Sequence, residues 1–369
     1  MKILYVINDI NFFLSHRLPL AEYAVKNNHE VFVASNSIPK FKIQGIKFLK
    51  FDINRSSIGL ISNLNSLIQL NKLIKKVTPD LVHSVTLKSI LFSNLCLIFN
   101  KKIKKVNAVS GLGFLFTSKR KSNAAKILKG LFKLINIICK PYYIFQNEKD
   151  LNEFKKMGVN ENYKLIKGSG VNHKDFLYSI PIKKQKVNII FTGRILRDKG
   201  IIELINAVQI LPREIQSKVV LNIYGKIDLD NPAHITEKEL KKLLKPDFII
   251  WNGNTDDIKN VLIGSDIYCL PSYREGLPKS TIEAMAIGRP IVTTKTPGCE
   301  DTVLNEVNGY KVNIKDHVTL SEKLQILIED ESLRLKMGKK SRDIFEENFT
   351  LDKVVKQTFE LYDSLVVKN

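Results

Sequence analysis

Two glutamates that stand eight positions apart, Glu275 and Glu283, flank a predicted turn from a strand into a helix. The apolar run at residues 266–271 predicts a short buried strand, and residues 281–287 have helical character that ends at a glycine. This spacing puts one carboxylate on the loop and the other in the first helical turns, both facing one cavity. Carboxylate oxygens accept strong charge-assisted hydrogen bonds from sugar hydroxyls. The pair therefore predicts either a sugar site or two acids that merely stabilise a helix start through its dipole.

Two cations follow an earlier predicted strand in the same way. Residues 191–200 read FTGRILRDKG, so that Arg194 and Lys199 stand on a turn between a strand end and a helix start. Arginine binds phosphate oxygens in pairs, lysine adds a mobile point charge, and the free amides of a helix start favour the same anion. Two solvated surface cations would give the same sequence pattern. Because the two glutamates follow further along the chain, the pattern favours a diphosphate site.

The basic charge of the chain is concentrated in its first half. The protein has 369 residues and a formal net charge of +21. Residues 1–185 hold 31 Lys and Arg against 10 Asp and Glu, whereas the remainder holds 27 of each. Between Leu81 and Asn147 there are twelve basic residues and no acidic one. Such one-sided charge indicates an anionic partner for the first half: a membrane surface, a diphosphate or a nucleic acid.

The composition is that of an ordinary globular protein large enough for two domains. Hydrophobic residues make up 44% and charged residues 26% of the chain, and this length can form two sizeable cores. The four cysteines have no C-x-x-C spacing, which indicates a reducing compartment and argues against structural zinc. No run of 18 apolar residues and no cleavable signal pattern is present, so we expect neither a membrane-spanning helix nor a signal peptide.

Strands and helices alternate along the chain, which predicts parallel, doubly wound sheets. The predicted strands of the first half are residues 2–7, 30–34, 46–52, 80–85, 106–109, 142–146 and 164–167. Those of the second half are residues 187–192, 219–224, 248–251, 267–270 and 290–293. A stretch rich in glycine, proline and lysine separates the halves, so we expect domains at 1–172 and 186–350 with a linker at 173–185. No glycine-rich turn follows the first strand, so the first domain is not expected to bind a nucleotide.

These stretches resemble the motifs of the family four retaining glycosyltransferases, which have the GT-B fold: an α/β architecture of two Rossmann-like, doubly wound domains facing a cleft. Glu275 and Glu283 resemble the E-x7-E signature of that family, and Arg194 and Lys199 resemble its G-R-x4-K-G turn. The resemblance implies that the two cations bind and neutralise the diphosphate of a nucleotide sugar, that Glu275 binds the donor sugar and that Glu283 binds the ribose. The implied donor-binding set is Arg194, Lys199, Gly193, Glu275, Gly276, Leu277, Pro278, Glu283 and Asn254. The resemblance also implies that a helix at 351–369 packs back on the first domain.

Stretches of the first half resemble a bacterial subgroup within this family, the N-acetylgalactosaminyltransferases that extend a sugar linked to undecaprenyl diphosphate. The resemblance lies at residues 12–21, 80–89, 110–114, 146–148 and 168–172, and it covers essentially the whole chain in order. The implied acceptor-binding set is His16, Arg17, His83, Lys88, Gly111 and Gly113. We expect its four side chains at or just after strand ends, with His16 also catalytic. Val85 stands where many members carry a second histidine.

Two further features resemble sites of other kinds. Asp228 and Asp230 look like the D-x-D metal motif of the other large glycosyltransferase fold, but Asn-Pro follows them as in relatives of the family above. We interpret them as a loop and not as a metal site. Cys299 has no histidine partner in view, so a packing role is favoured over a nucleophile. We therefore expect no metal and no cofactor, with the UDP-sugar as a substrate.

The segment from Lys101 to Cys139 combines basic clusters with an amphipathic helix. Residues 122–139 are expected to place five apolar side chains on one helical face, with three lysines beside them: Ile127, Leu131, Leu134, Ile135 and Ile138, with Lys126, Lys129 and Lys133. This pattern indicates binding to an anionic membrane surface. The alternative is a helix that packs on the core and exposes its lysines. A nucleic acid is not expected, since no helix-turn-helix, zinc-finger or aromatic-sheet signature accompanies the charge.

Together these features predict a retaining glycosyltransferase that moves a sugar, a HexNAc, from a UDP-sugar to a polyprenyl-diphosphate-linked saccharide in surface polysaccharide assembly. We expect it in the cytoplasm, peripherally attached to the inner face of the cytoplasmic membrane. Two alternatives stay open. A GT-B-fold epimerase would change the UDP-sugar without an acceptor, and a non-catalytic binding subunit of an assembly complex would bind it unchanged.

Overall fold

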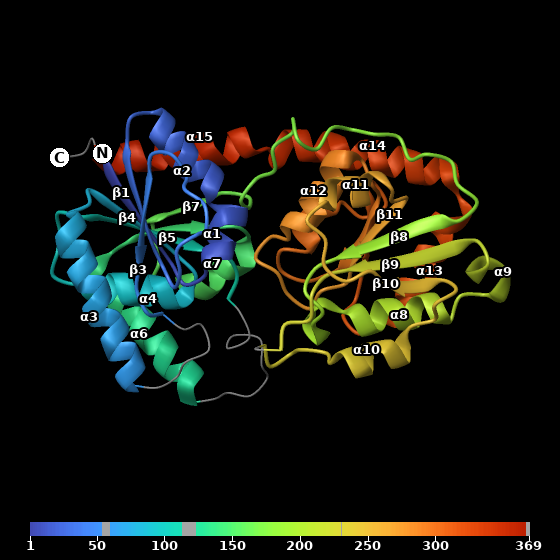
Figure 1. The fold of residues 1–369 in the computed structure, drawn as a ribbon, viewed down its shortest axis with the longest axis horizontal. Helices are drawn as coiled ribbons and strands as arrows, with labels where there is room; N and C mark the ends of the chain where they lie inside the picture. The colour runs from blue at the N-terminus through green and yellow to red at the C-terminus, as the bar shows by residue number, and fades with distance from the viewer. Residues whose placement is uncertain (54–59, 113–122, 230, 367–369) are drawn as a thin grey trace. The chain divides into compact units, whose positions relative to one another are not determined.

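The computed structural model of the protein describes residues 1–53, 60–112, 123–229 and 231–366. The chain forms two compact units (Figure 1). Unit 1 comprises Met1–Ser169 together with Asp352–Asn369, and unit 2 comprises Gly170–Leu351. The boundary falls at Ser169 and Gly170, and residues 173–185 belong to unit 2.

Unit 1 is built on a parallel sheet, and its seven described strands lie in the order β3-β2-β1-β4-β5-β6-β7. The strands are β1 Lys2–Ile7, β2 Glu30–Ser35, β3 Ile46–Lys50, β4 Leu81–Val85, β5 Lys104–Val109, β6 Tyr142–Phe145 and β7 Tyr163–Leu165. The described helices are α1 Ile10–His16, α2 Leu18–Lys26, α3 Leu60–Val77, α4 Leu87–Cys96, α6 Asn123–Cys139, α7 Glu148–Lys155 and α15 Leu351–Val366. The central strands β1, β4 and β5 are largely buried because helices cover both faces of the sheet.

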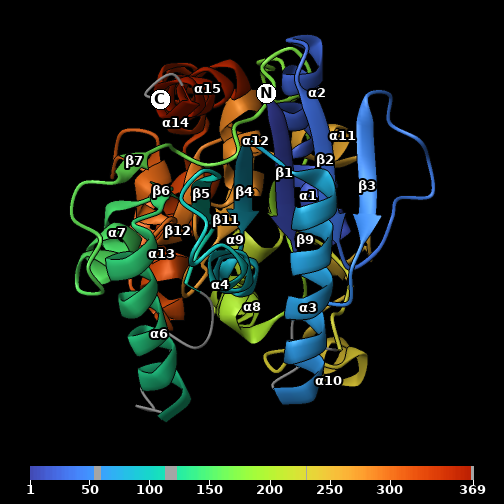
Figure 2. The same ribbon diagram turned by 90° about the vertical axis from the view of Figure 1, so that its left-hand side faces the viewer.

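The two faces of this sheet are covered by different helices (Figure 2). Side chains alternate along a strand, so Leu4 and Val6 of β1 pack on Leu70 of α3. Tyr5, between them, points to the other face, where its ring lies 5.3 Å from that of His83. Helix α15 covers this second face together with α2, since the Tyr23 and Phe359 ring centroids are 4.7 Å apart. The C-terminal helix is thus an integral layer of unit 1.

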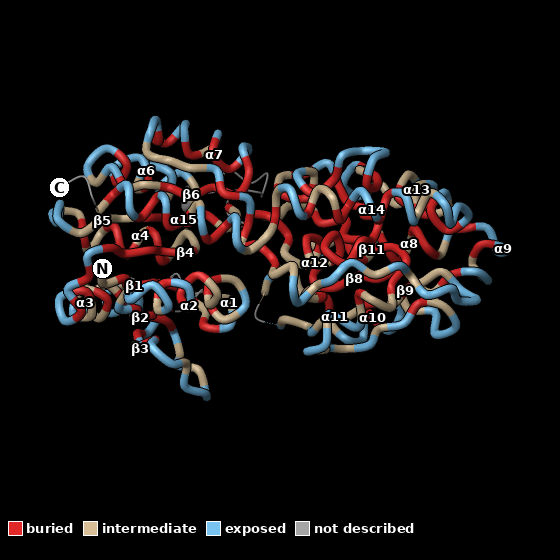
Figure 3. The backbone as a smooth tube through the Cα atoms, turned by 90° about the horizontal axis from the view of Figure 1, so that it is seen from above, coloured by how far each residue is buried: buried red, intermediate tan, exposed pale blue. Residues whose placement is uncertain are grey.

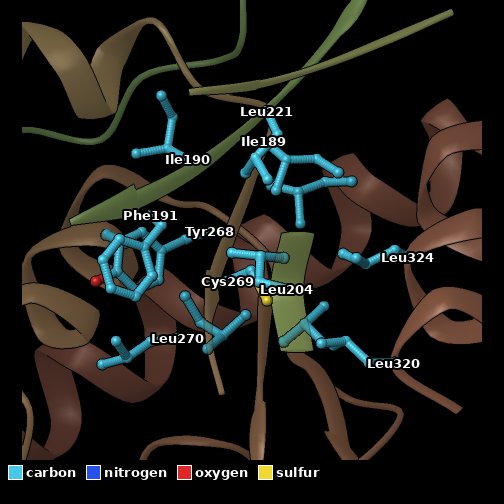
Figure 4. Packing of buried hydrophobic residues seen from close by; sticks show 14 of the residues in the cluster. Ile189, Ile190, Phe191, Leu204, Leu221, Tyr268, Cys269, Leu270, Leu320 and Leu324 are labelled. Carbon is cyan, nitrogen blue, oxygen red and sulfur yellow. The ribbon is translucent and has the colours of Figure 1, made fainter. Parts of the chain in front are cut away.

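Unit 2 repeats the same plan with six described parallel strands in the order β10-β9-β8-β11-β12-β13. The strands are β8 Val187–Thr192, β9 Val219–Tyr224, β10 Ile249–Trp251, β11 Ile267–Leu270, β12 Ile291–Thr294 and β13 Gly309–Val312. The helices are η1 Arg197–Lys199, α8 Ile201–Gln209, α9 Arg213–Gln216, α10 Glu237–Leu243, α11 Ile258–Ile263, α12 Lys279–Ile287, η2 Glu300–Thr302, α13 His317–Glu329 and α14 Glu331–Asn348. Figure 4 shows β8 and β11 side chains packed against Leu204 of α8 and Leu320 of α13.

Burial follows the sheets in both units (Figure 3), and every residue of β4 and of β11 is buried. In each unit the strand order reverses beside the first strand: between β1 and β4 in unit 1, and between β8 and β11 in unit 2. Open parallel sheets bind ligands outside the carboxyl ends of the two strands at such a reversal. The turns after these four strands are therefore the places to look for function.

The α/β, doubly wound architecture predicted from the alternation is confirmed, and most strands begin and end within two residues of their predicted bounds. Among the elements that were not named from the sequence are helix α1 and strand β13. Helix α1 is capped by Asp9, whose side chain accepts a hydrogen bond from the Asn11 amide at 2.9 Å. Strand β13 is short and begins with a glycine, so its pattern is weak.

Candidate functional site

The turn after β8 carries Arg194 along the end of β9. The Gly193 amide donates to the Tyr224 carbonyl at 3.0 Å, and the Ile195 amide donates to the Lys226 carbonyl at 3.0 Å. Ile195 is buried in the core, so the alternation of an extended chain directs Arg194 outward. Its Nη1 donates to Asp228 Oδ2 at 2.7 Å. This pair lies at the carboxyl edge of the sheet.

Lys199 reaches the same edge because Gly200 allows a close approach between two loops. Gly200 has φ +70, and a Cβ there would lie 2.1 Å from the Pro271 carbonyl oxygen, so no other residue fits. The contact brings the turn before α8 against the exit of β11. The Lys199 ammonium forms an ion pair with the Glu275 carboxylate, and both side chains are largely buried. The structure therefore pairs Lys199, which is predicted to bind phosphate, with Glu275, which is predicted to bind the sugar.

The loop that bears Glu275 is held in place by the loop after β12. The Glu275 amide donates to the Pro297 carbonyl at 3.1 Å, and the Thr296 hydroxyl donates to the Ser272 carbonyl at 3.1 Å. Gly298 has φ +77, and a Cβ there would lie 2.5 Å from the Gly276 carbonyl oxygen. Cys299 is fully buried, and burial raises the pKa of its thiol to about 12. A neutral, buried thiol supports the packing role.

Helix α12 presents Glu283 beside a lysine. The Lys279 Nζ and Glu283 Oε1 atoms are 3.4 Å apart, one helical turn along α12. Burial raises the pKa of Glu283, and the nearby Lys279 charge opposes that shift. The start of α12 is tied to the sheet by Tyr268, whose hydroxyl bonds the Ser280 hydroxyl at 2.8 Å and the Thr192 hydroxyl at 3.0 Å. Strands β8 and β11 and helix α12 are thus fixed to one another where the site lies.

Several buried polar atoms near these turns have no hydrogen-bond partner in the described residues: Asp198 Oδ1, Ser272 Oγ and Thr281 Oγ1. Buried polar atoms are nearly always paired, so unpaired ones need an explanation. Burial raises the pKa of Asp198, the Lys199 charge lowers it, and the Glu275 charge raises it. Spare acceptors and donors of this kind suit a hydroxyl-rich, charged ligand.

The remaining predicted donor residues are placed as follows. Gly193 and Gly276 lie in the two turns just described, Leu277 is buried in the core of unit 2, and Pro278 is the residue before α12. Asn254 is exposed after β10, and no hydrogen bond within the described ranges joins it to the ion pairs above. Its role stays a prediction.

Two residues at this edge were missed from the sequence. Asp228 was interpreted only as a loop residue, although the sheet order places the loop after β9 beside the loop after β8, which carries Arg194. Lys279 was not singled out. A lysine in the first turn of a helix is unfavourable because it opposes the helix dipole. The position of Lys279 in that turn, four residues before Glu283, is therefore a sequence signal that could have identified it.

In unit 1, the side chains of Arg17 and His83 are buried rather than exposed to solvent. His83 is the third residue of β4 and is 1% exposed, so the expectation that it lies at a strand end was wrong. Because side chains alternate along β4, the His83 ring points toward α15, where its Nδ1 lies 2.5 Å from the Tyr362 hydroxyl. Burial, and next the Arg17 charge, hold the pKa of His83 well below its usual range.

Arg17 joins α1 to α2 and is 5% exposed. Its Nη1 donates to the His16 carbonyl at 3.1 Å and to the Ser169 hydroxyl at 3.0 Å, while its buried Nε has no partner among the described residues. Burial lowers the pKa of Arg17 to about 10, and the groups that oppose this shift are the hydroxyls of Tyr362 and Tyr5 rather than carboxylates. The guanidinium is a buried cation.

The other predicted acceptor residues lie close to the ends of strands or helices. His16 ends α1, stacked at 4.1 Å on Phe12. Lys88 is the second residue of α4, and burial lowers its pKa. Gly111 follows β5 with φ +114. Gly113 lies outside the described residues, as does Asp230 of the D-x-D-like stretch.

Helix α6 is apolar on two sides. Phe132 and Ile135 are buried against the core, so the prediction that Ile135 belongs to the outward stripe was wrong. The exposed apolar side chains of the helix are Ile127, Leu134, Ile137 and Ile138. Residues 113–122 of the predicted basic segment lie outside the described residues. Among the helices that the structure describes, none has the length and apolar character to cross a membrane.

Comparison with known proteins agrees with this geometry. The model of the family glycosyl transferases group 1 matches residues 174–344, and a glycosyl transferase 4-like model matches residues 2–140. The chain is 28% identical, over 97% of its length and 99% of the relative, to the N,N'-diacetylbacillosaminyl-diphospho-undecaprenol alpha-1,3-N-acetylgalactosaminyltransferase of Campylobacter jejuni. It is 26% identical, over 84% of its length and 82% of the relative, to the UDP-Gal:alpha-D-GlcNAc-diphosphoundecaprenol alpha-1,3-galactosyltransferase of Escherichia coli.

The fold is shared with solved structures at lower identity. Sucrose-phosphate synthase from Thermosynechococcus elongatus superimposes with a TM-score of 0.84 and 18% identity, with all of both chains covered. The two family matches fall on different units, and the group 1 match contains Arg194, Lys199, Glu275 and Glu283. The chain is therefore a glycosyltransferase with the GT-B fold, and the group 1 family model matches its unit 2.

Proposed function

We propose that the protein transfers a HexNAc from a UDP-sugar to a saccharide carried on a polyprenyl diphosphate, with retention of configuration at the transferred sugar. The observation that carries this proposal is the pairing of Lys199 with Glu275 at the carboxyl edge of β8 and β11, with Arg194 on the turn after β8 and Glu283 in helix α12. Cations for a diphosphate and carboxylates for hydroxyls are thereby held on one rigid sheet edge.

Each side chain has a distinct task in the transfer. When the bond from sugar to diphosphate breaks, negative charge builds on the leaving diphosphate, and cations placed beforehand stabilise it without reorganisation. Arg194 and Lys199 supply that charge. Glu275 accepts hydrogen bonds from donor sugar hydroxyls, and Glu283 accepts them from the ribose. The amides of Gly276 and Leu277, beside the start of α12, contribute further donors.

The substrate classes are supported by the relatives. The C. jejuni and E. coli proteins are both named for acceptors linked to undecaprenyl diphosphate, and the E. coli protein is named for a UDP-linked donor. Their transferred sugars differ, one being N-acetylgalactosamine and the other galactose. A panel of donors is therefore needed to identify the sugar.

The acceptor is bound by unit 1 in this proposal. Arg17 is a buried cation whose described hydrogen bonds go to a carbonyl and a hydroxyl, while its Nε has no partner among the described residues. A buried cation that has no carboxylate partner is costly, and an anionic ligand can supply the missing charge. His16 ends α1 directly before Arg17, and Lys88 lies in the first turn of α4. The acceptor diphosphate supplies the matching charge.

No divalent metal takes part in this proposal, because Arg194 and Lys199 provide the positive charge that a metal would otherwise supply. Turnover that is unchanged in excess EDTA would agree with this. Loss of turnover in EDTA that Mg²⁺ or Mn²⁺ restores would contradict it.

Attachment to an anionic membrane surface is also part of the proposal. Helix α6 exposes four large apolar side chains among lysines, and it lies in the stretch without acidic residues between Leu81 and Asn147. An apolar stripe inserts at the headgroup level while the lysines bind anionic lipids. The protein would then work at the surface that holds its lipid-linked acceptor.

The test is nucleotide release from UDP-, GDP- and dTDP-sugars, with and without a polyprenyl-diphosphate-linked acceptor. We expect UDP release that depends on the acceptor and that Glu275→Ala abolishes. Glu322→Ala, an exposed glutamate on α13, is the matched control and should leave the rate unchanged. Isomerisation of the UDP-sugar without an acceptor, or binding without any turnover, would contradict the proposal.

A further inference from the structure

The loop after β9 is fixed against the turn that bears Arg194. The Arg197 amide donates to the Ala233 carbonyl at 2.8 Å, and Leu196 and His234 form an antiparallel bridge. Inside the loop, the Asn231 amide donates to the Asp228 carbonyl at 3.1 Å. Asp228 therefore stands on a backbone that is itself anchored on both sides.

Asp228 holds the Arg194 guanidinium at one corner only. A single contact of 2.7 Å joins Nη1 to Oδ2, and the two side chains are 34% and 22% exposed. The Nε and Nη2 groups of Arg194 bond no described residue. These two N–H groups form the side of the guanidinium that binds two oxygens of a phosphate or carboxylate in parallel.

We propose that Asp228 is a positioning residue for donor binding: it fixes Arg194 through Nη1 so that the Nε–Nη2 side stays available to the diphosphate. This inference rests on the proposed function. Arginine has a long side chain with many rotamers, and a ligand that binds a free one must first order it. Asp228 carries out that ordering in advance, and its carboxylate balances the Arg194 charge before the donor arrives.

A competing role would lead to the opposite result. If Asp228 merely occupied Arg194 until the diphosphate displaced it, its removal would strengthen donor binding. The geometry favours positioning, because the contact leaves the two-oxygen side of the guanidinium unused. The two roles therefore differ in the sign of the effect on affinity.

The test measures calorimetric binding of UDP and UMP to the wild type and to Asp228→Ala, Asp228→Asn, Arg194→Ala and the double variant Asp228→Ala/Arg194→Ala. We expect Asp228→Ala to weaken UDP binding about five- to tenfold and UMP binding much less, since UMP lacks the second phosphate. Asp228→Asn should recover most of the loss, because its amide oxygen accepts the same hydrogen bond. Without Arg194, removal of Asp228 should have no further effect.

Three results would overturn the inference. Tighter UDP binding by Asp228→Asn or Asp228→Ala would establish the competing role. Equal losses for UDP and UMP that persist in the Arg194→Ala background would mean that Asp228 only maintains the loop. A wild-type protein that binds neither UDP nor a UDP-sugar would contradict the proposed function itself, and the inference would fall with it.

Discussion

The imidazole Nδ1 of His83 and the hydroxyl of Tyr362 lie 2.5 Å apart in the core of unit 1, although 279 residues separate them in the sequence. The contact joins the middle of β4 to α15. Both side chains are buried, and the His83 Nε2 has no partner among the described residues. Within the described residues, the His83 imidazole therefore makes its one hydrogen bond to Tyr362.

Removing the hydroxyl should destabilise the protein with little change in shape. Tyr362→Phe leaves both nitrogens of a buried imidazole without partners, which costs about 1–3 kcal/mol. Urea denaturation measures the change in the free energy of unfolding. Tyr23→Phe is the matched control, because Tyr23 is exposed and packs on α15 through its ring. An equal and small effect of both substitutions would mean that the His83 contact contributes nothing.

Glu283 should make the protein less stable as the pH rises. Burial raises its pKa in the folded state, so the folded protein holds this proton more tightly than the unfolded chain. Stability from this group is present at low pH and is lost as the pH rises from the unfolded pKa through the raised folded one. Glu283→Gln should therefore raise the thermal midpoint more at pH 8 than at pH 4.5, while it weakens UDP binding.

The comparison for that experiment is Glu322→Gln, an exposed glutamate on α13. Its effect on the thermal midpoint should be small at both pH values. A gain for Glu283→Gln that is the same at pH 4.5 and pH 8 would show that the Glu283 charge has no part in it.

Gly298 should be required for the position of Glu275. A Cβ at Gly298 would lie 2.6 Å from the Glu275 carbonyl oxygen, so Gly298→Ala must shift the Glu275 loop. We expect kcat/KM to fall by about 100-fold, as displacement of a catalytic group by about 1 Å can cause. Gly158→Ala is the matched control: φ is also positive, at +89, but the nearest atom is 3.8 Å away and belongs to unit 1. Equal losses of activity for both variants would point to backbone strain alone.

The exposed stripe of α6 should control membrane binding. The double substitution Leu134→Glu/Ile138→Glu places two acids among apolar and basic groups, so sedimentation with vesicles of anionic lipid should fall by more than tenfold. Both side chains are exposed, so the thermal midpoint should change little. Leu335→Glu, an exposed leucine on α14, should leave vesicle binding intact. Unchanged binding by the double variant would place the membrane contact elsewhere.

The features that local sequence patterns encode could be predicted from the sequence alone. Runs of buried residues fix the strands, and a turn between strand and helix places Arg194, Lys199, Glu275 and Glu283 at the carboxyl edge of a sheet. The alternation of the two element types likewise predicts the doubly wound plan. Each of these inferences uses residues that are close together in the chain.

What depended on sheet order or distant packing could not be predicted. The partnership of Arg194 with Asp228 requires that β9 lie beside β8. The buried contact of His83 with Tyr362 could not be predicted, because Tyr362 comes from the far end of the sequence. Ile135 was assigned to the wrong side of its helix, since α6 is apolar on both sides and only the tertiary structure decides which side is buried.

The return of α15 to unit 1 has a consequence for synthesis on the ribosome. Unit 2 is one continuous stretch, Gly170–Leu351, whereas unit 1 needs Asp352–Asn369 to complete its core. A nascent chain that has emerged only as far as Ser169 still exposes the face of β1 and β4 that Tyr362 and Phe359 will cover. Unit 1 is therefore the first unit to be translated, but it can complete its core only after α15 has been synthesised.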